Sequence, residues 1–435
     1  MPGLVLFKID AVVLLVDALT EVVEQSPEQL ARQFALLLLG AALVGMLARR
    51  IGVPYAVALV VGGLVIEESH VTTVPTLDPG LVLFGFLPPL LFDAAFRLDT
   101  REARSLLRPI LLLALPGTLL TALVVGGIVA IVLNLPLVVG LLFGSLVAAT
   151  DPVAVIGVFK GLRAPPRLAA IAESESLIND GVAITIYTAV LGLALTGTGS
   201  ASEVLRTFGQ EVVGGVLIGG VLGFVFSRLT GVVDDHLIEM MLSLALAYGS
   251  YVAAQSVHAS GPLACVAAGV IHGSYGRQIG MSETTRRLLD DLWEFLGFVA
   301  NAIVFVLVGF TANLARLAAD AWPAAVAIVA VLLARFVLLG APSLVRKRGV
   351  LATSPAERVV LAWSGLRGAL TITLALALPP EAPSRGLIVA MSFGVVLFTM
   401  LVQGLSLPLL LRRLGLVQPA VSIAAGNPAE PVRDA

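Results

Sequence analysis

Apolar residues along this chain are grouped in long runs with few charges, rather than on one face of amphipathic segments. A helix needs roughly 20 consecutive apolar residues to cross a bilayer, and runs near that length recur from one end of the chain to the other. The pattern predicts an all-α polytopic membrane protein with about thirteen transmembrane helices. The predicted spans are residues 30–48, 52–67, 80–96, 104–133, 136–159, 168–195, 207–228, 237–257, 261–273, 292–312, 322–343, 357–379 and 387–411.

Two of these runs depart from the usual length. Residues 104–133 exceed what one span needs, so we expect a tilted helix or a kink at Pro116. Residues 261–273 are short for a span. The fifth and twelfth spans hold corresponding places if the chain consists of two six-span units with one span between them, and this symmetry predicts inverted repeats.

The two ends of the chain differ from its middle. Residues 1–27 are expected to form an interfacial or flexible segment, because the apolar stretch 4–23 lacks the basic start and the cleavage site of a signal peptide. Residues 28–413 are expected to form one transmembrane domain. Residues 414–435, short and rich in Ala and Pro, are expected to be a disordered cytoplasmic tail.

Composition supports a membrane protein over a soluble one. Charged residues make up 13% of the chain and the mean hydropathy is +1.00, whereas soluble proteins carry about 25% charged residues. These values exclude a large soluble enzyme built on a buried sheet. The net charge of −2 gives no reason to expect a nucleic-acid partner, and the single Cys265 excludes an intramolecular disulfide framework.

Lys and Arg residues lie mainly in alternate gaps between the predicted spans. Cytoplasmic loops are the basic ones, so the amino end is predicted outside the cell membrane and the carboxyl end in the cytoplasm. The basic residues of the cytoplasmic gaps are Arg49, Arg50, Arg97, Arg101, Lys160, Arg163, Arg167, Arg277, Arg286, Arg287, Arg346, Lys347 and Arg348.

The fifth span contains Thr150 and Asp151 near its middle, and ionisable residues inside a membrane are functional candidates. Asp before Pro152 is typical of a helix N-cap followed by proline at the first helical position. Pro152 also lacks an N–H group, which leaves carbonyls one turn earlier without a partner. The pattern predicts a helix that breaks here and restarts around Pro152.

The sixth span contains the stretch ESESLINDG, with three carboxylates in an apolar setting. Ser176 and Asp180 are four residues apart and share one helix face. Glu175 and Asn179 share a second face, rotated by about 100° from the first. Glu173 lies two turns before Asp180 and toward the cytoplasmic end. It could line an entry path, but we expect an end-of-helix charge near the lipid headgroups.

The twelfth span is interrupted as well, because Gly365 and Gly368 flank Arg367. Two interrupted spans in corresponding places are the best pointer in a sequence to a transport site. The eleventh span adds Arg335 and the tenth adds Asn301.

Oxygen ligands from Asp, Ser, Thr and unpaired carbonyls suit a hard cation, and a carboxyl group away from water can also hold a proton. One site that takes either ion, and never both, is the minimum that an exchanger requires. The alternative is that these polar groups merely join helices to one another.

Four stretches of the chain, ATDPVAVIGVFK, ESLINDG, WEFLGFVANAIVFVLVG and WSGLRGAL, together resemble the NhaP/NHE-type sodium/proton antiporters of the monovalent cation:proton antiporter superfamily. The resemblance covers nearly the whole membrane region, in the family's order and spacing. It implies a thirteen-span homodimer with a dimerisation domain and a mobile core domain, whose interrupted helices cross at the ion site. It also implies exchange of Na⁺ or Li⁺ for H⁺ by alternating access, a role in pH homeostasis, and no cofactor.

The resemblance also implies roles for the residues of the ion site. Asp180 would be the principal carboxylate for cation and proton, and Asp151, Thr150 and Ser176 would complete the cation shell. Asn179 is similar to the residue found in the electroneutral branch of the family, which implies exchange of one cation for one proton.

Further residues match supporting positions of the family. Glu175 and Arg335 are similar to its buried ion pair, and Arg367 to its second core arginine. Asp93 stands where relatives carry an acidic residue. Glu173 has no counterpart in the family motif.

Other functions remain open at this level. Potassium/proton exchange on the same scaffold is the nearest alternative, since ligand types do not determine the cavity size. A passive cation channel would need a carbonyl filter or a ring of charge, and neither is evident in the sequence. An intramembrane hydrolase could use two Asp residues that share a proton, but the TDP and NDG contexts differ from protease motifs, so we expect a transporter and not an enzyme.

Overall fold

The computed structural model describes residues 27–51, 53–69, 80–197, 201–311, 314–345 and 353–417. All regular elements within these ranges are helices, which confirms the predicted all-α class. Eight of the described helices are long and apolar enough to cross a membrane, and three shorter apolar helices accompany them. The count of thirteen spans and the inverted repeats stay predictions, and most of the predicted amino-terminal segment and tail lies outside the described residues.

The helices follow one another along the whole described chain, and several are interrupted by π-helical segments, labelled η. In chain order they are α2 (Pro27–Ile51), α3 (Tyr55–Ser69), η1 (Leu81–Phe86), α4 (Leu87–Phe96), α5 (Thr100–Ser105), α6 (Leu107–Leu112), η2 (Leu113–Gly117), α7 (Thr118–Val132), α8 (Leu137–Leu146), α9 (Val153–Gly161), α10 (Pro166–Thr196), α11 (Ala201–Thr230), α12 (His236–Ser256), α13 (Gly261–Ile271), η3 (His272–Gly276), α14 (Arg277–Ile279), α15 (Glu283–Thr311), α16 (Leu314–Ala319), α17 (Ala321–Val345), α18 (Pro355–Trp363), α19 (Ala369–Leu376), α20 (Arg385–Phe398), η4 (Thr399–Gly404) and α21 (Leu405–Arg413).

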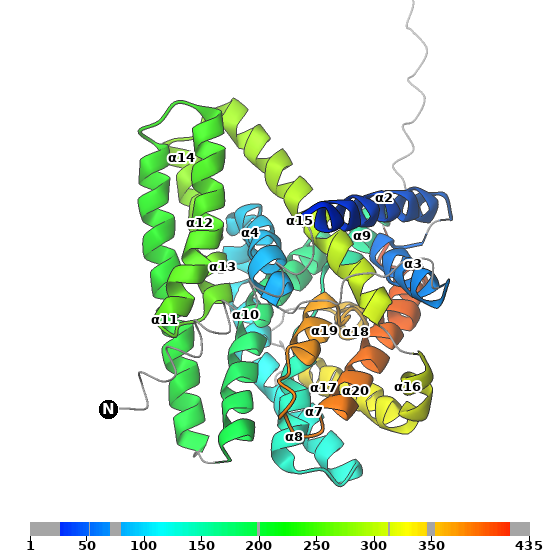
Figure 1. Cartoon of the computed structure of the whole chain (residues 1–435). Helices are drawn as coiled ribbons and strands as arrows, with labels where there is room; N and C mark the ends of the chain where they lie inside the picture. The colour runs from blue at the N-terminus through cyan, green and yellow to red at the C-terminus, as the bar shows by residue number, and fades with distance from the viewer. Residues whose placement is uncertain are drawn as a thin grey trace, which may run out of the picture.

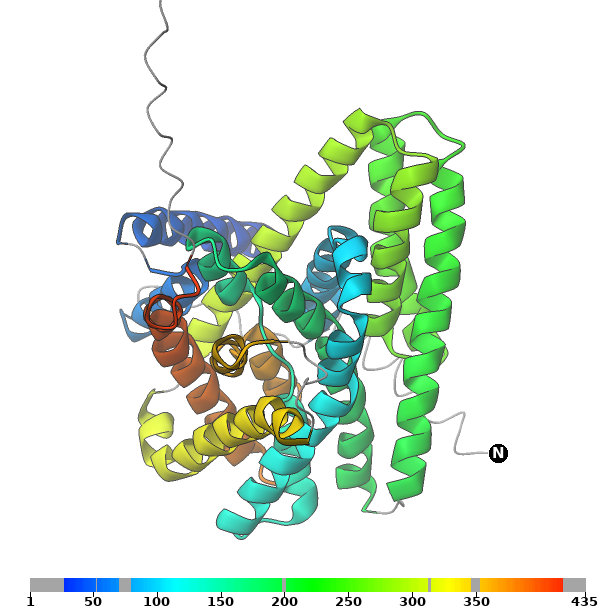
Figure 2. The same cartoon turned by 180° about the vertical axis from the view of Figure 1, so that it is seen from behind.

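Two groups of helices lie side by side. Helices α11, α12, α13 and α14 form one group, and α2, α3 and the helices from α16 onward lie on the other side of the molecule (Figure 1). Helix α15 runs obliquely from the first group to α3 in the second (Figure 2). Helix α10 lies between the groups, so a polar residue at its middle is enclosed from both sides.

Small residues allow α11 and α13 to approach until their backbones touch. A side-chain carbon added at Gly215 or Gly219 of α11 would collide with Ser260, which caps α13, or with α13 itself, and one added at Gly223 would lie only 3.0 Å from the backbone of α13. Small residues spaced four apart are a recurring device for close helix packing in membranes. The facing residues are Gly215 with Ser260, Gly219 with Ala264, and Gly223 with Ala268.

Two of the predicted spans can be compared with the helices in detail. The long run at 104–133 is interrupted by the π-helical segment η2, which contains Pro116, as expected of a proline inside a helix. Helix α15 begins at Glu283, so the charged residues 283–291 extend the helix beyond the apolar run predicted as the tenth span.

Candidate ion-binding site

The two predicted interruptions are present, and they meet in space. The chain is not helical between α8 and α9, nor between α18 and α19. The backbone N–H of Asp151 in the first break donates a hydrogen bond of 2.8 Å to the carbonyl oxygen of Leu366 in the second. Residues more than 200 positions apart are therefore joined where each chain segment has left the helical path.

The second half of the fifth span starts around Pro152, as predicted. Pro152 is the N-cap and Val153 the first helical residue of α9. The backbone N–H of Val153 donates a 2.9 Å hydrogen bond to Oδ1 of Asp151. The other carboxylate oxygen of Asp151 is not engaged in this contact, and the residue is partly exposed to a cavity.

Arg367 donates hydrogen bonds to backbone carbonyl groups just after the end of α8. Its Nη1 donates hydrogen bonds of 2.8 Å and 2.7 Å to the carbonyl oxygens of Ala148 and Ala149, and its side chain is 1% exposed. Carbonyls after the end of a helix have no partner within the helix. The sequence predicted unpaired carbonyls near Pro152, but it did not indicate that Arg367 binds them.

Helix α10 holds the first break through the side chains of Asn179 and Ser176. Nδ2 of Asn179 donates a 2.7 Å hydrogen bond to Oγ1 of Thr150, and the backbone N–H of Thr150 donates to Oδ1 of Asn179 at 3.3 Å. The hydroxyl of Ser176 donates to the carbonyl oxygen of Thr150. All three residues are buried, so α10 sets the position of the segment before Asp151.

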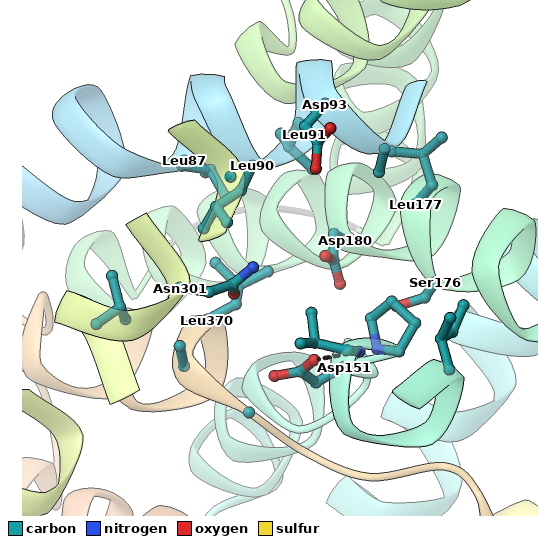
Figure 3. A pocket seen from close by; sticks show the side chains of 18 of the residues that line it. Leu87, Leu90, Leu91, Asp93, Asp151, Ser176, Leu177, Asp180, Asn301 and Leu370 are labelled. Carbon is teal, nitrogen blue, oxygen red and sulfur yellow. Dashed lines mark hydrogen bonds between the residues drawn. The ribbon is translucent and has the colours of Figure 1, made fainter. Parts of the chain in front are cut away.

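A cavity of about 300 Å³ contains the predicted ion-binding residues. Figure 3 shows the carboxylates of Asp180 and Asp151 in one space, with Ser176 beside them. Thr150 and Asn301 also line this cavity. One oxygen of Asp180 is buried without a hydrogen-bond partner, so the carboxylate is not used up by a structural contact.

Charged residues surround the opening of the cavity. Arg97, Lys160 and Glu294 are the exposed charged groups of its lining, and they mark where it reaches the surface. Arg97 pairs with Asp93, through a 2.9 Å hydrogen bond from Nη2 to Oδ2, and with Glu294 at 3.0 Å. Glu173 lines the same cavity, as the alternative of an entry path implies.

The sequence analysis did not single out Lys160 or Glu294 as cavity residues. Lys160 was assigned only to a basic loop, and Glu294 lies in the charged turns that start α15. No local pattern reveals that both sides of one opening come from α9 and α15, because that proximity depends on the fold.

Glu175 and Arg335 contact each other away from the cavity. Arg335 donates to both carboxylate oxygens of Glu175, from Nη1 to Oε1 and from Nη2 to Oε2, the second at 2.9 Å. The side chains are 2% and 7% exposed. A carbon added at Gly365 would lie 2.9 Å from Nε of Arg335, so this ion pair joins α10 and α17 directly beside the break between α18 and α19.

Comparison with known proteins identifies the family. Residues 36–413 match the family model described as sodium/hydrogen exchanger, transmembrane. The Na⁺/H⁺ antiporter NhaP of Pseudomonas aeruginosa is 41% identical over 352 residues, covering 78% of this chain and 82% of the relative. The Na⁺/H⁺ antiporter ApNhaP of Aphanothece halophytica is 39% identical over 370 residues, covering 84% of this chain and 70% of the relative.

A solved structure has the same fold. The sodium proton antiporter MjNhaP1 of Methanocaldococcus jannaschii at pH 8 matches with a TM-score of 0.72 and 23% identity, over 88% of this chain and 97% of that one. The predicted resemblance is thereby confirmed. This multi-pass membrane protein, with two interrupted helices meeting at a carboxylate-lined cavity, belongs to the sodium/hydrogen exchanger family.

Proposed function

We propose that the protein exchanges Na⁺, or Li⁺, for H⁺ across the cell membrane, and that Asp180 is the group that carries either ion. The observation that carries the proposal is the placement of Asp180 and Asp151 in one cavity between interrupted helices. The named relatives are Na⁺/H⁺ antiporters, and they give no support to potassium/proton exchange.

The cation shell consists of oxygens from Thr150, Asp151, Ser176 and Asp180. A hydroxyl that donates one hydrogen bond keeps lone pairs for a cation, so Ser176 can hold Thr150 and bind Na⁺ together. Asn179 supports the shell through Thr150. The protein needs no resident cofactor, since the cation and the proton are its substrates.

Supporting residues hold this shell in place. Arg367 and the pair of Glu175 with Arg335 fix the two breaks from the side opposite the cavity. Asp93 acts at the cavity opening, where its pairing with Arg97 limits the charge that an entering cation meets.

Transport proceeds by alternating access, in which the site opens to one side of the membrane and then to the other. The transmembrane domain, residues 28–413, comprises a dimerisation part and a mobile core part, and the protein works as a homodimer. The amino end lies outside and the carboxyl end in the cytoplasm, so the cavity with Lys160 at its opening faces the cytoplasm, in line with the excess of basic residues on that side.

Proteoliposomes with a preset pH gradient test the proposal. Adding Na⁺ or Li⁺ should dissipate the gradient, whereas choline should not, and K⁺ tests the remaining alternative. With one cation exchanged for one proton, a potential clamped by valinomycin should leave the rate unchanged. Sustained voltage-dependent transport would refute the electroneutral stoichiometry.

The Asp180→Asn variant provides the decisive comparison, because it keeps the shape of the side chain and removes its charge. Exchange should be lost while the protein remains folded. Asp291→Asn removes a carboxylate that is exposed and does not line the cavity, so its exchange should match the parent. Residual coupled exchange in folded Asp180→Asn would place the carrier group elsewhere, with Asp151 as the next candidate.

A further inference from the structure

The route from Asp180 to the side of the membrane opposite the cavity can be followed along α10. The cavity extends from Asp180 toward the amino-terminal end of this helix, where Glu173 lines it. The opposite route must therefore pass the residues that follow Asp180. Gly181, Thr185 and Thr188 share a face of α10 that neighbours the face of Asp180, and each of them contacts α11 or the start of α13.

The first part of this route is closed by a thin buried layer. Leu263 packs against Gly181 so closely that a carbon added at Gly181 would lie 2.7 Å from its Cγ. One turn further, Oγ1 of Thr185 donates a 3.1 Å hydrogen bond to Oγ of Ser260. Thr185, Ser260 and Leu263 are 1%, 5% and 4% exposed, so neither water nor an ion reaches Asp180 from this side.

Beyond this layer lie two polar residues, Thr188 and Glu211, that are exposed or partly exposed. Thr188 lies eight residues after Asp180, about 12 Å along the helix, and it is exposed. Its hydroxyl oxygen lies 3.0 Å from the carbonyl oxygen of Thr185 and 3.4 Å from Oε2 of Glu211 on α11, and Glu211 is partly exposed. Residues 181–187 of α10 are all buried and Thr188 is the first exposed one after them. Helices α10 and α11 lie next to each other in both overall views (Figures 1 and 2).

Glu211 has a hydroxyl partner, Thr188, but no charged one. It lies inside the apolar helix segment Leu205–Thr230, and none of the ion pairs among the described residues includes it. A carboxylate inside a membrane without an opposite charge beside it is costly, and such residues mark ion pathways. Its backbone carbonyl accepts a 3.0 Å hydrogen bond from the N–H of Ser260, which fixes Glu211 against the closing layer.

We propose that Glu211 binds the transported monovalent cation on the side of the membrane opposite the cavity, just beyond a closing layer formed by Leu263, Thr185 and Ser260. The Thr188 hydroxyl is the second oxygen of this position. When the layer opens, a cation held there is a little over two helical turns, about 12 Å, from Asp180. The inference rests on the proposed exchange function. It adds a residue that binds the cation at only one of the two membrane faces.

Side-specific kinetics test this role. Na⁺/H⁺ exchange is measured in right-side-out and in everted vesicles, with Na⁺ varied at one face at a time. In Glu211→Gln the apparent KM for Na⁺ should rise about fivefold at the face opposite the cavity, the size expected for one charge contact in water. The KM at the cavity face and the maximal rate should match the parent.

Glu203→Gln is the matched control, since it removes one negative charge from the first turn of the same helix and should leave both KM values unchanged. Equal KM values for Glu211→Gln and the parent at the face opposite the cavity would overturn the inference, and so would equal changes at both faces. If Glu211→Gln does not accumulate, Glu211→Asp replaces it. This variant should raise the KM for Na⁺ at the face opposite the cavity by less than about fivefold, and an unchanged KM at that face would also overturn the inference. A parent protein without any exchange would instead refute the proposed function.

Discussion

The backbone N–H of Asp151 is hydrogen-bonded to the carbonyl oxygen of Leu366 at 2.8 Å. The two residues belong to different interrupted helices, and each lies in the non-helical stretch of its own. Any displacement of α18 or α19 therefore moves the backbone of a proposed cation ligand. Substitutions in the second break should consequently affect ion binding, although most residues of that break are not ligands.

Gly368 offers the most direct test of this coupling. A side-chain carbon added there would overlap the carboxylate of Asp151, so Gly368→Ala must displace that carboxylate. We expect Gly368→Ala to fold and to lose most of its Na⁺-dependent exchange, as measured by dissipation of a pH gradient. Gly249→Ala, at a glycine with open space around it, should retain parental activity. Parental exchange in Gly368→Ala would show that the exact position of Asp151 does not matter.

The ion pair of Glu175 and Arg335 should contribute to stability more than to ion affinity. Removing one partner of a buried pair typically costs about 3–5 kcal/mol, because the remaining charge is left without compensation. Glu175→Gln should lower the melting temperature and the yield, whereas the double variant Glu175→Gln/Arg335→Met should recover part of the loss. Thermal unfolding in detergent measures both. A stable Glu175→Gln protein with strongly weakened Na⁺ affinity would instead make Glu175 a ligand.

Arg367 should be replaceable by Lys only in part. Arg367→Met leaves the carbonyls of Ala148 and Ala149 buried without donors, at a cost of about 1–3 kcal/mol for each. Lys keeps a positive charge but lacks the planar fork of donors, so the melting temperature of Arg367→Lys should fall between those of Arg367→Met and the parent. Equal melting temperatures for the parent and Arg367→Met would contradict a role in holding α8.

Competition between H⁺ and Na⁺ should be visible in the pH dependence of transport. If Asp180 carries either ion, protons occupy the site below its pKa and compete with Na⁺. The apparent KM for Na⁺ should then rise about tenfold for each unit by which the pH is lowered below that pKa. The maximal rate should change little. Initial rates from about pH 5.5 to about pH 9 cover the range in which this competition is expected. A Na⁺ KM that is independent of pH would exclude a shared site.

Local sequence patterns predicted the breaks of the helices but not the contacts that stabilise them. Asp151 before Pro152, and Gly365 with Gly368 around Arg367, are signals carried by neighbouring residues, and both breaks are present in the structure. The hydrogen bonds of Arg367 join positions more than 200 residues apart. From the sequence alone, a buried arginine such as Arg367 could equally well pair with an ion-binding residue or pack between helices.

The depth of Glu173 could not be read from the sequence. At the end of an apolar run it resembles a charge that reaches for the headgroups, because a sequence gives no depth for a residue until neighbouring helices are placed. The structure places Glu173 in the lining of the cavity. The charged first turns of α15 carry no apolar run, so the sequence pattern gave no sign that the helix extends to Glu283.

The glycine contacts between α11 and α13 restrict how this protein can move. Their backbones meet at three levels, one turn apart, so sliding one helix along the other would bring side chains against backbone. We expect the pair to move as one body, together with Leu263 and Ser260 at its end. In the proposed alternating access, opening the closed side would then separate α10 from this body, and the shear would fall on the contacts at Gly181, Thr185 and Thr188.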